Sequence, residues 1–491
     1  MRRVFAWFRS HPLSTIFLVF IGCAVGTHLL ANWRAEVRWQ RYCAAARARG
    51  VKLTLAEFAP PEIPDAENFA KIPMLRAIFT GGVQSPLELP RAGDSQPSFG
   101  NPVKGERIDW KAWQKFFKDA GWLTEITDDA PRDVLRALEH YAPQVQEWSK
   151  WKTRTRCQFA LDLKAGAAMP LPHLNIFIDA TKLFQLRLRA HLALGDSRAA
   201  YEDFRQCFQS YRALVEEPTL ICALVKITCL RLAISAVGDG LGDHLWTDTE
   251  LQKIATDFTT ARVWNDYTSA FASERGFGNS IEEEHIAMTP WSRAKVIGAI
   301  KGLPGLSGPS IAPSLALFIP DRMFRDNQLR ANHHIDELLN RVNADGTKYD
   351  PDAQTLSDDD HLQGFDTIWF ALFKMSAPVF STMGGQFAFV QTQLDMASLG
   401  IAIERFRLAR GAIPETLAEL VPEFIPQLPR DVYSDAPMIY RPRENGQFLL
   451  YSVGPDRRDD GGAIDPKKFE SRQPDWVWSY SQMGSKTRSA E

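Results

Sequence analysis

The chain of 491 residues lacks most of the features that identify an enzyme or a disulfide-rich secreted protein. Its six cysteines are too few for a disulfide scaffold, and none lies in a CxxC or zinc-binding spacing. No GxSxG, Walker A or GxGxxG sequence is present. The net charge of −2 gives no basic excess, which argues against a nucleic-acid partner. We therefore expect a binding role rather than catalysis.

Long apolar runs are also scarce, and the one of about 19 residues, from Leu13 to Ala31, is interrupted only by Ser14, Thr15, Thr27 and His28. A helix of these 19 residues is about 28 Å long, close to the bilayer hydrocarbon thickness of about 30 Å. Aromatic side chains flank the run, as they do at membrane interfaces: Trp7, Phe8, Trp33 and Trp39. The sequence therefore predicts one transmembrane anchor, and residues 1–33 comprise a short cytoplasmic tail and this anchor.

The orientation of the anchor is not decided by charge. Three arginines precede the apolar run and three follow it closely: Arg2, Arg3, Arg9, then Arg34, Arg38 and Arg41. The short tail favours a cytoplasmic N-terminus, which predicts an inner-membrane protein with an extracytoplasmic, periplasmic body. A cleaved signal peptide and a lipoprotein box at Phe20–Cys23 are alternatives. The run is long for a signal peptide and lacks an A-x-A site, so we expect a retained anchor.

The region after the anchor has helical patterning. Residues 34–108 are predicted to form a juxtamembrane helix and a proline-rich strap, and residues 109–380 a helical body. Leu174–Leu194 is predicted as a strongly apolar helix that ends at Gly195, and Asp196 can cap the next helix. The predicted fold class is therefore mainly α, with a body of helical hairpins.

Three cysteines of this body allow two interpretations. Cys222 and Cys229 lie two turns apart on one predicted helix, about 10.5 Å, which is too far for a mutual disulfide. Cys207 could reach one of them in an oxidising compartment. Otherwise all three are small buried side chains.

Two histidine-containing clusters also invite a catalytic or metal interpretation. Glu282-Glu283-Glu284-His285 lacks the second histidine of a zincin helix, and the adjacent His333 and His334, near Asp336, point to different sides of a helix. We expect solvated helix faces at both. The alternative is an extracytoplasmic hydrolase with dispersed catalytic residues, in which Glu284, His285, His333 or Asp336 would line one pocket.

The C-terminal region combines a helix with short strands. The helix Gln386–Ala409 is ended by Gly411. Three strands are predicted to follow, at 438–440, 448–453 and 476–478, and a Glu-Asn-Gly turn joins the first two. Residues 381–480 are thus predicted to form an α+β module with a small antiparallel sheet, and residues 481–491 a disordered tail.

This ending resembles the globular part of the major pseudopilin of type II secretion systems. The resemblance spans about 90 residues (386–478). It rests on Arg405–Pro414, Leu417–Leu420, Leu428–Asp431, Tyr440-Arg441, Leu450–Asp456 and Asp475-Trp476. The whole chain resembles membrane-anchored bacterial proteins with the same ending.

The pseudopilin resemblance implies a calcium site in the loop after the second strand. By position the two main ligands are Asp456 and Asp475, and Asp459, Asp460 or Asp465 could add oxygen donors. Neighbouring carboxylates repel one another unless a cation neutralises them, and Ca²⁺ takes six to eight oxygens. Arginines at 457–458 stand where the family prefers glycine, and they could neutralise the aspartates instead.

The resemblance has a limit at the N-terminus, because the apolar run contains no acidic residue and no pseudopilin cleavage site precedes it. A filament subunit is therefore not expected. The sequence instead predicts a non-catalytic, single-pass cell-envelope protein with an interaction or scaffold role. Its expected partners are the membrane and other envelope proteins, with the secretion machinery as one candidate.

Overall fold

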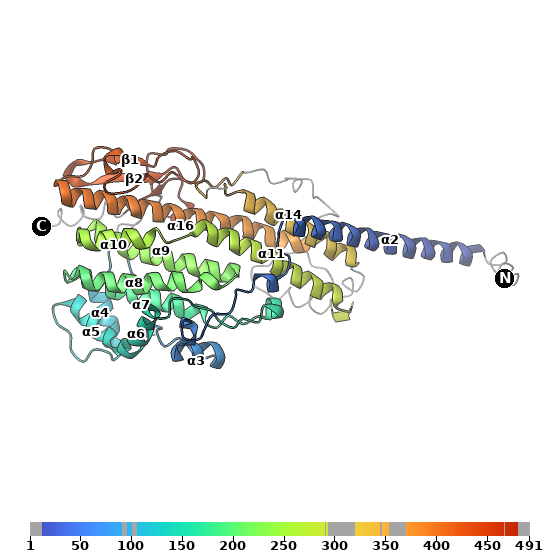
Figure 1. The fold of residues 1–491 in the computed structure, drawn as a ribbon, viewed down its shortest axis with the longest axis horizontal. Helices are drawn as coiled ribbons and strands as arrows, with labels where there is room; N and C mark the ends of the chain where they lie inside the picture. Colours follow the sequence, from blue (N-terminus) through green and yellow to red (C-terminus); the bar gives the residue numbers. More distant parts are fainter. Residues whose placement is uncertain are drawn as a thin grey trace.

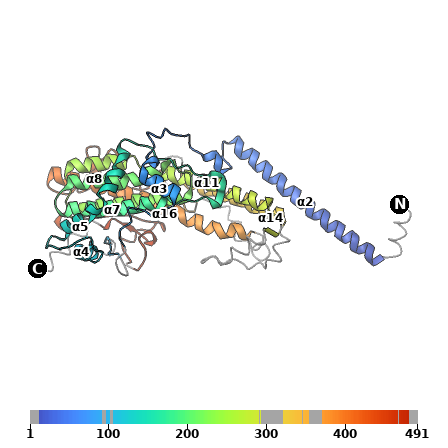
Figure 2. The ribbon, with the colours of Figure 1, turned by 90° about the horizontal axis from the view of Figure 1, so that it is seen from below.

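The computed structural model describes residues 12–90, 96–100, 106–289, 291–292, 320–343, 346–352, 370–465 and 467–479. The chain is mostly helical, with a small antiparallel sheet near the C-terminus, as the sequence predicted. The body is elongated, and one long helix extends from one of its ends in both views (Figures 1 and 2).

The helices and strands follow the chain in a simple order. The helices are α2 (Pro12–Ala48), α3 (Pro73–Gly81), α4 (Trp110–Asp119), α5 (Ala130–Leu138), α6 (Ala142–Trp148), α7 (Leu174–Ala193), α8 (Ser197–Ala213), α9 (Leu220–Gly242), α10 (Asp248–Phe258), α11 (Val263–Ala287), α14 (Asp321–Asn340) and α16 (Ala371–Arg410). The strands are β1 (Ile439–Pro442), β2 (Phe448–Ser452) and β3 (Trp476–Val477).

Helices α7, α8 and α9 pack against one another and form the centre of the body. The predicted hairpin is confirmed: Gly195 adopts a left-handed φ of +78°, and the Asp196 side chain accepts a hydrogen bond from the Ala199 N–H at 2.9 Å. These local signals end one helix and start the next, so α8 returns antiparallel to α7.

Helix α9 is an apolar helix that the sequence analysis did not single out, because charged residues interrupt it. Among the described residues it is the one helix that is long and apolar enough to cross a membrane, but 61% of its most apolar stretch is buried inside the body. It is therefore a core helix here. The expected span Leu13–Ala31 lies within α2, and the side chains of residues 13–15, 17 and 18 are outside the described part of the chain.

The sheet has the order β1-β2-β3, and both pairs are antiparallel. It lies along α16 at the end of the body away from the N-terminus (Figure 1). The Trp476 ring packs edge-on against Phe389 of α16, with ring centroids 5.0 Å apart. The main core runs without a break from the α4–α9 region into α16 and the sheet. Helix α16 begins at Ala371, within the expected helical body.

Glu404 joins α16 to the loop after α9. Its buried carboxylate accepts hydrogen bonds from Arg407 at 2.7 and 2.8 Å and lies 2.8 Å from Nδ1 of His244. Burial alone would raise the pKa of Glu404, but the hydrogen bonds from Arg407 and His244 outweigh it and hold the pKa below its usual value. The folded state therefore favours the charged carboxylate.

We expect Glu404→Gln to lower the free energy of unfolding by about 1–3 kcal/mol at pH 7, because it removes charge-assisted hydrogen bonds. A folded pKa below the unfolded one gives stability that is present above the unfolded pKa and is lost as the pH falls through the folded pKa. Urea unfolding curves of the two proteins should therefore converge as the pH drops well below 4.5, the ordinary glutamate value.

The matched control is Glu423→Gln, which removes an exposed ion pair at 2.8 Å to Arg410, the last residue of α16. This change should cost less than about 0.5 kcal/mol. Equal losses in the two variants would contradict the role given to Glu404.

Candidate functional site

The second half of α2 is fixed to the body by charged contacts with α14. Arg325 of α14 lies 2.7 Å from Glu36 of α2 and also pairs with Glu283 of α11. Arg38 pairs with Asp326 at 2.5 Å. Beneath these pairs, one small apolar cluster holds α2 against the body: Trp39, Tyr42, Cys43, Ala46 and Leu53. The contact begins near residue 32, and we call it the anchor junction.

Asp336 lies at the centre of the anchor junction. Its carboxylate accepts hydrogen bonds from Arg275 at 2.5 Å and from the Tyr42 hydroxyl at 3.3 Å, and it lies 3.8 Å from Arg49. Burial raises the pKa of Tyr42 to about 12, so the phenol remains a protonated donor at neutral pH. Asp336 therefore links α2, α11 and α14.

The strap after α2 lies directly on α11. A Cβ at Gly276 would come within 2.6 Å of backbone atoms of Thr54 and Leu55, so only glycine permits this approach. Asn279 donates a hydrogen bond from Nδ2 to the Leu53 carbonyl at 2.9 Å. Glu57 accepts the backbone N–H groups of Leu53 and Thr54 and completes a capping box.

The four residues of the hydrolase alternative do not form one group: His333 and Asp336 of α14 both contact Tyr42, whereas Glu284 and His285 lie on α11. Glu284 and His333 are exposed, and the His285 ring lies beside Phe324 of α14, with centroids 5.7 Å apart. Asp336 lies twelve residues after Phe324 on the same helix, about 18 Å along its axis. The structure therefore places Asp336 in the anchor junction, far from His285.

The predicted calcium ligands lie around the loop after β2. Asp475 is fully buried; its Oδ2 accepts the Gly462 N–H at 2.7 Å, but its Oδ1 has no hydrogen-bond partner. Asp459 accepts from the Tyr451 hydroxyl at 2.6 Å and pairs with Arg441 at 3.3 Å. Asp456 and Asp460 are exposed. Burial raises the pKa of Asp475, and the charges of Asp460 and Asp459 add to this effect.

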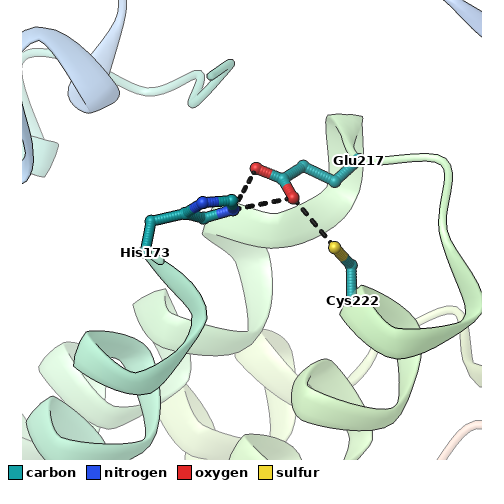
Figure 3. A group of neighbouring side chains, drawn as sticks. All are labelled: His173, Glu217 and Cys222. Carbon is teal, nitrogen blue, oxygen red and sulfur yellow. Dashed lines mark hydrogen bonds and ion pairs between the residues drawn. The ribbon is translucent and has the colours of Figure 1, made fainter. Parts of the chain in front are cut away.

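A different group of ligand-type side chains lies in the core. Among the described residues, His173, Glu217 and Cys222 are the group of His, Cys, Asp and Glu whose ligand atoms all lie within 4.8 Å of one another; the four aspartates above do not meet this criterion. Glu217 lies between the other two (Figure 3). Its Oε1 and Oε2 lie 2.8 and 2.9 Å from His173 Nε2, and the Cys222 thiol donates to Oε2 at 2.9 Å. We call this group the His-Glu-Cys cluster.

Three helix ends position the His-Glu-Cys cluster. His173 precedes the first residue of α7, Glu217 lies in the link between α8 and α9, and Cys222 lies in the first turn of α9. Thr219 caps α9 and donates its hydroxyl to the Cys222 sulfur at 2.8 Å. The ring of Phe159 stacks on His173 at 4.0 Å and closes that side.

Sequence reasoning left Cys222 as either a disulfide partner of Cys207 or a small buried side chain, and it missed the other two members of the cluster. Cys207, Cys222 and Cys229 are all buried free thiols in the structure. The Cys222 thiol donates to a carboxylate, whereas Cys207 and Cys229 lie 3.6 Å from backbone carbonyls. Burial and the Glu217 charge raise the pKa of Cys222, which makes it a poor nucleophile without a counter-charge. The sequence feature that could have indicated this cluster is the short spacing between Glu217 and Cys222 just before an apolar helix.

Comparison of the chain with protein-family models, with curated proteins and with solved structures gives no match.

The strap contact on α11 predicts different effects for two glycines of that helix. Gly276→Ala should destabilise the body by about 1–3 kcal/mol, because the new methyl group overlaps the backbone at 54–55. Gly278→Ala meets nothing within 4 Å and should be neutral or stabilising by up to about 1 kcal/mol. Urea unfolding measures both, and hydrogen exchange at 53–57 should accelerate only in Gly276→Ala. Two neutral variants would show that the strap does not lie on α11.

Proposed function

We propose that the chain is a single-pass inner-membrane protein, in which the first half of α2 crosses the bilayer and the second half holds an extracytoplasmic interaction module. Eight large apolar side chains of α2 between Ile16 and Trp33 are exposed, among them Phe20 at 70%. Leaving such side chains in water costs about 1.5–3 kcal/mol each. This exposed apolar surface is the observation that carries the proposal, and lipid is the covering we assign to it.

The length of the exposed segment fits a bilayer. From Pro12 to Ala31, before the anchor junction begins, the helix is about 30 Å long. Asn32 accepts the backbone N–H of Arg322 at 3.2 Å, and Ala35 is already buried against the body. Helix α2 continues through both regions without a break in the described residues, so it would hold the body at a fixed distance from the membrane (Figure 2).

An interaction role suits a body fixed in this way. Helix pairs present broad side surfaces, and the C-terminal part combines a long helix with a three-stranded antiparallel sheet, which supports the pseudopilin-like interpretation of that region. We propose other envelope proteins as partners, with the secretion machinery as one candidate. The flanking arginines are balanced, so we propose the extracytoplasmic body as an orientation that the reporter fusion below tests.

We also propose that the loop after β2 binds Ca²⁺. The specific observation is the buried Oδ1 of Asp475, which has no hydrogen-bond partner, near the carboxylates of Asp459 and Asp460. A hard cation would satisfy this oxygen and relieve the repulsion among the three carboxylates. The alternative is that Arg441, which pairs with Asp459, neutralises part of this negative charge without a metal ion.

The anchor is tested by placing two charges in it. Phe20→Arg with Val25→Arg should cost about 5–7 kcal/mol of insertion free energy, because an arginine at the bilayer centre costs about 2.5–3.5 kcal/mol. We expect the wild type to resist carbonate extraction from membranes and the double variant to be released. Phe469→Arg, at an apolar side chain of the body that is 77% exposed, is the matched control and should remain in the membrane.

The orientation is tested with a C-terminal alkaline phosphatase fusion, which is active only outside the cytoplasm. High activity in the wild type supports the proposal. A cytoplasmic reporter, or a wild-type chain that carbonate releases, would contradict it.

Calcium binding is tested by melting the full chain in millimolar Ca²⁺ and in chelator. Calcium should raise Tm by a few degrees, because a ligand that binds only the folded state stabilises it. Asp475→Asn should lose this response, and it should remain folded in chelator because the amide oxygen of asparagine can still accept the Gly462 N–H. Asp128→Asn, at an exposed position outside the loop, should respond like the wild type. An unchanged wild-type Tm would end the calcium proposal.

A further inference from the structure

The His-Glu-Cys cluster has no part in the anchor or in the proposed calcium loop. His173 and Cys222 are fully buried and Glu217 is 8% exposed, so three polar side chains have been taken out of water together. Such burial is costly unless every polar atom finds a partner. Some interaction must therefore offset the free-energy cost of burying these three side chains.

Hydrogen bonds inside the cluster do not satisfy all of its polar atoms. Both Nε2 of His173 and the Cys222 thiol direct their hydrogen bonds to Oε2 of Glu217. Oε1 of Glu217 contacts Nε2 at 2.8 Å without an aligned hydrogen bond, and Nδ1 of His173 has no hydrogen-bond partner. A buried carboxylate oxygen with free lone pairs is what a bound cation would satisfy.

The chemistry of the three donors selects the kind of cation. An imidazole nitrogen, a carboxylate oxygen and a sulfur are the ligands that Zn²⁺ takes, whereas Ca²⁺ and Mg²⁺ take oxygen donors. We propose that His173 Nε2, Glu217 and Cys222 Sγ bind one Zn²⁺ as a structural site. The charges of Zn²⁺, one carboxylate and one thiolate sum to zero, so the zinc-bound site places no net charge in the core.

The geometry requires only small movements. Around a tetrahedral Zn²⁺ with ordinary bond lengths, ligand atoms lie about 3.3–3.6 Å apart. The Glu217 oxygens lie 2.8 Å from His173 Nε2 and 2.9 Å from Cys222 Sγ, so these two contacts have to open by less than about 1 Å, and the ligand atoms all lie within 4.8 Å of one another. Cys222 lies in the first turn of α9, where the helix dipole stabilises a thiolate. The Thr219 hydroxyl, 2.8 Å from the sulfur, is near enough to supply a fourth ligand.

A zinc ion at this position would join parts of the chain that are far apart in sequence. It would tie the start of α7 to the α8–α9 link and to the start of α9. These three segments belong to the central helix layer, so the ion would stabilise the body as a whole.

The experiment measures the metal content of the full-length protein, purified without chelator, by mass spectrometry of the elements. We expect about one zinc per chain in the wild type, and little in Cys222→Ser and Glu217→Gln, whose affinity should fall at least about 100-fold. Cys229→Ser removes a buried thiol two turns along the same helix and should retain the zinc. Circular dichroism checks that each variant is folded.

A second measurement does not depend on the variants. The wild type, stripped of metal and titrated with Co²⁺, should develop a thiolate-to-metal charge-transfer band, and Zn²⁺ should abolish it and raise Tm by a few degrees. Wild-type protein with no zinc and no Co²⁺ band would show that the cluster is a hydrogen-bonded group without metal. Another metal in its place, or zinc retained in Cys222→Ser, would also overturn the assignment.

Discussion

The structure depends on one constraint: the first half of α2 exposes large apolar side chains, and its second half bonds to the body. The exposed apolar side chains end near Trp33, and the buried contacts begin at Ala35. From there the ion pairs of Arg325 and Asp326, together with the apolar cluster around Trp39, fix the direction of the helix. The direction of the first half of α2 relative to the body follows from this junction, because a continuous helix transmits direction along its length.

Two ion pairs in the core explain why α9, which is also an apolar helix, lies inside the body. Helix α9 carries Lys226 and Asp239, and each finds an oppositely charged partner on a neighbouring helix: Asp266 of α11 and Arg189 of α7. Burial lowers the pKa of Lys226, and the charge of Asp266 opposes that effect. Breaking such a pair would leave a buried charge without compensation. These partners are supplied by the folded body, and a lipid bilayer has none to offer.

Much of the fold was predictable from short-range chemistry. Gly195 and Gly411 mark helix ends because only residues that tolerate a positive φ close a helix in this way, and both adopt one. The three strands lie within a residue or two of the predicted ranges, since a turn and two apolar runs define them locally. The candidate sites were less predictable. His173 and Glu217 lie 44 residues apart, and no local pattern connects them.

The sequence by itself determined the apolar run, the helix ends, the strand positions and the acidic loop, because each depends on neighbouring residues. Only the tertiary structure decided that Asp336 lies in the anchor junction, that Asp475 has an unpaired oxygen, and that three helix ends bring His173, Glu217 and Cys222 together. The physical reason is the same in each case. Contacts between distant segments arise from the packing of whole helices, and that packing depends on all of the buried surfaces at once.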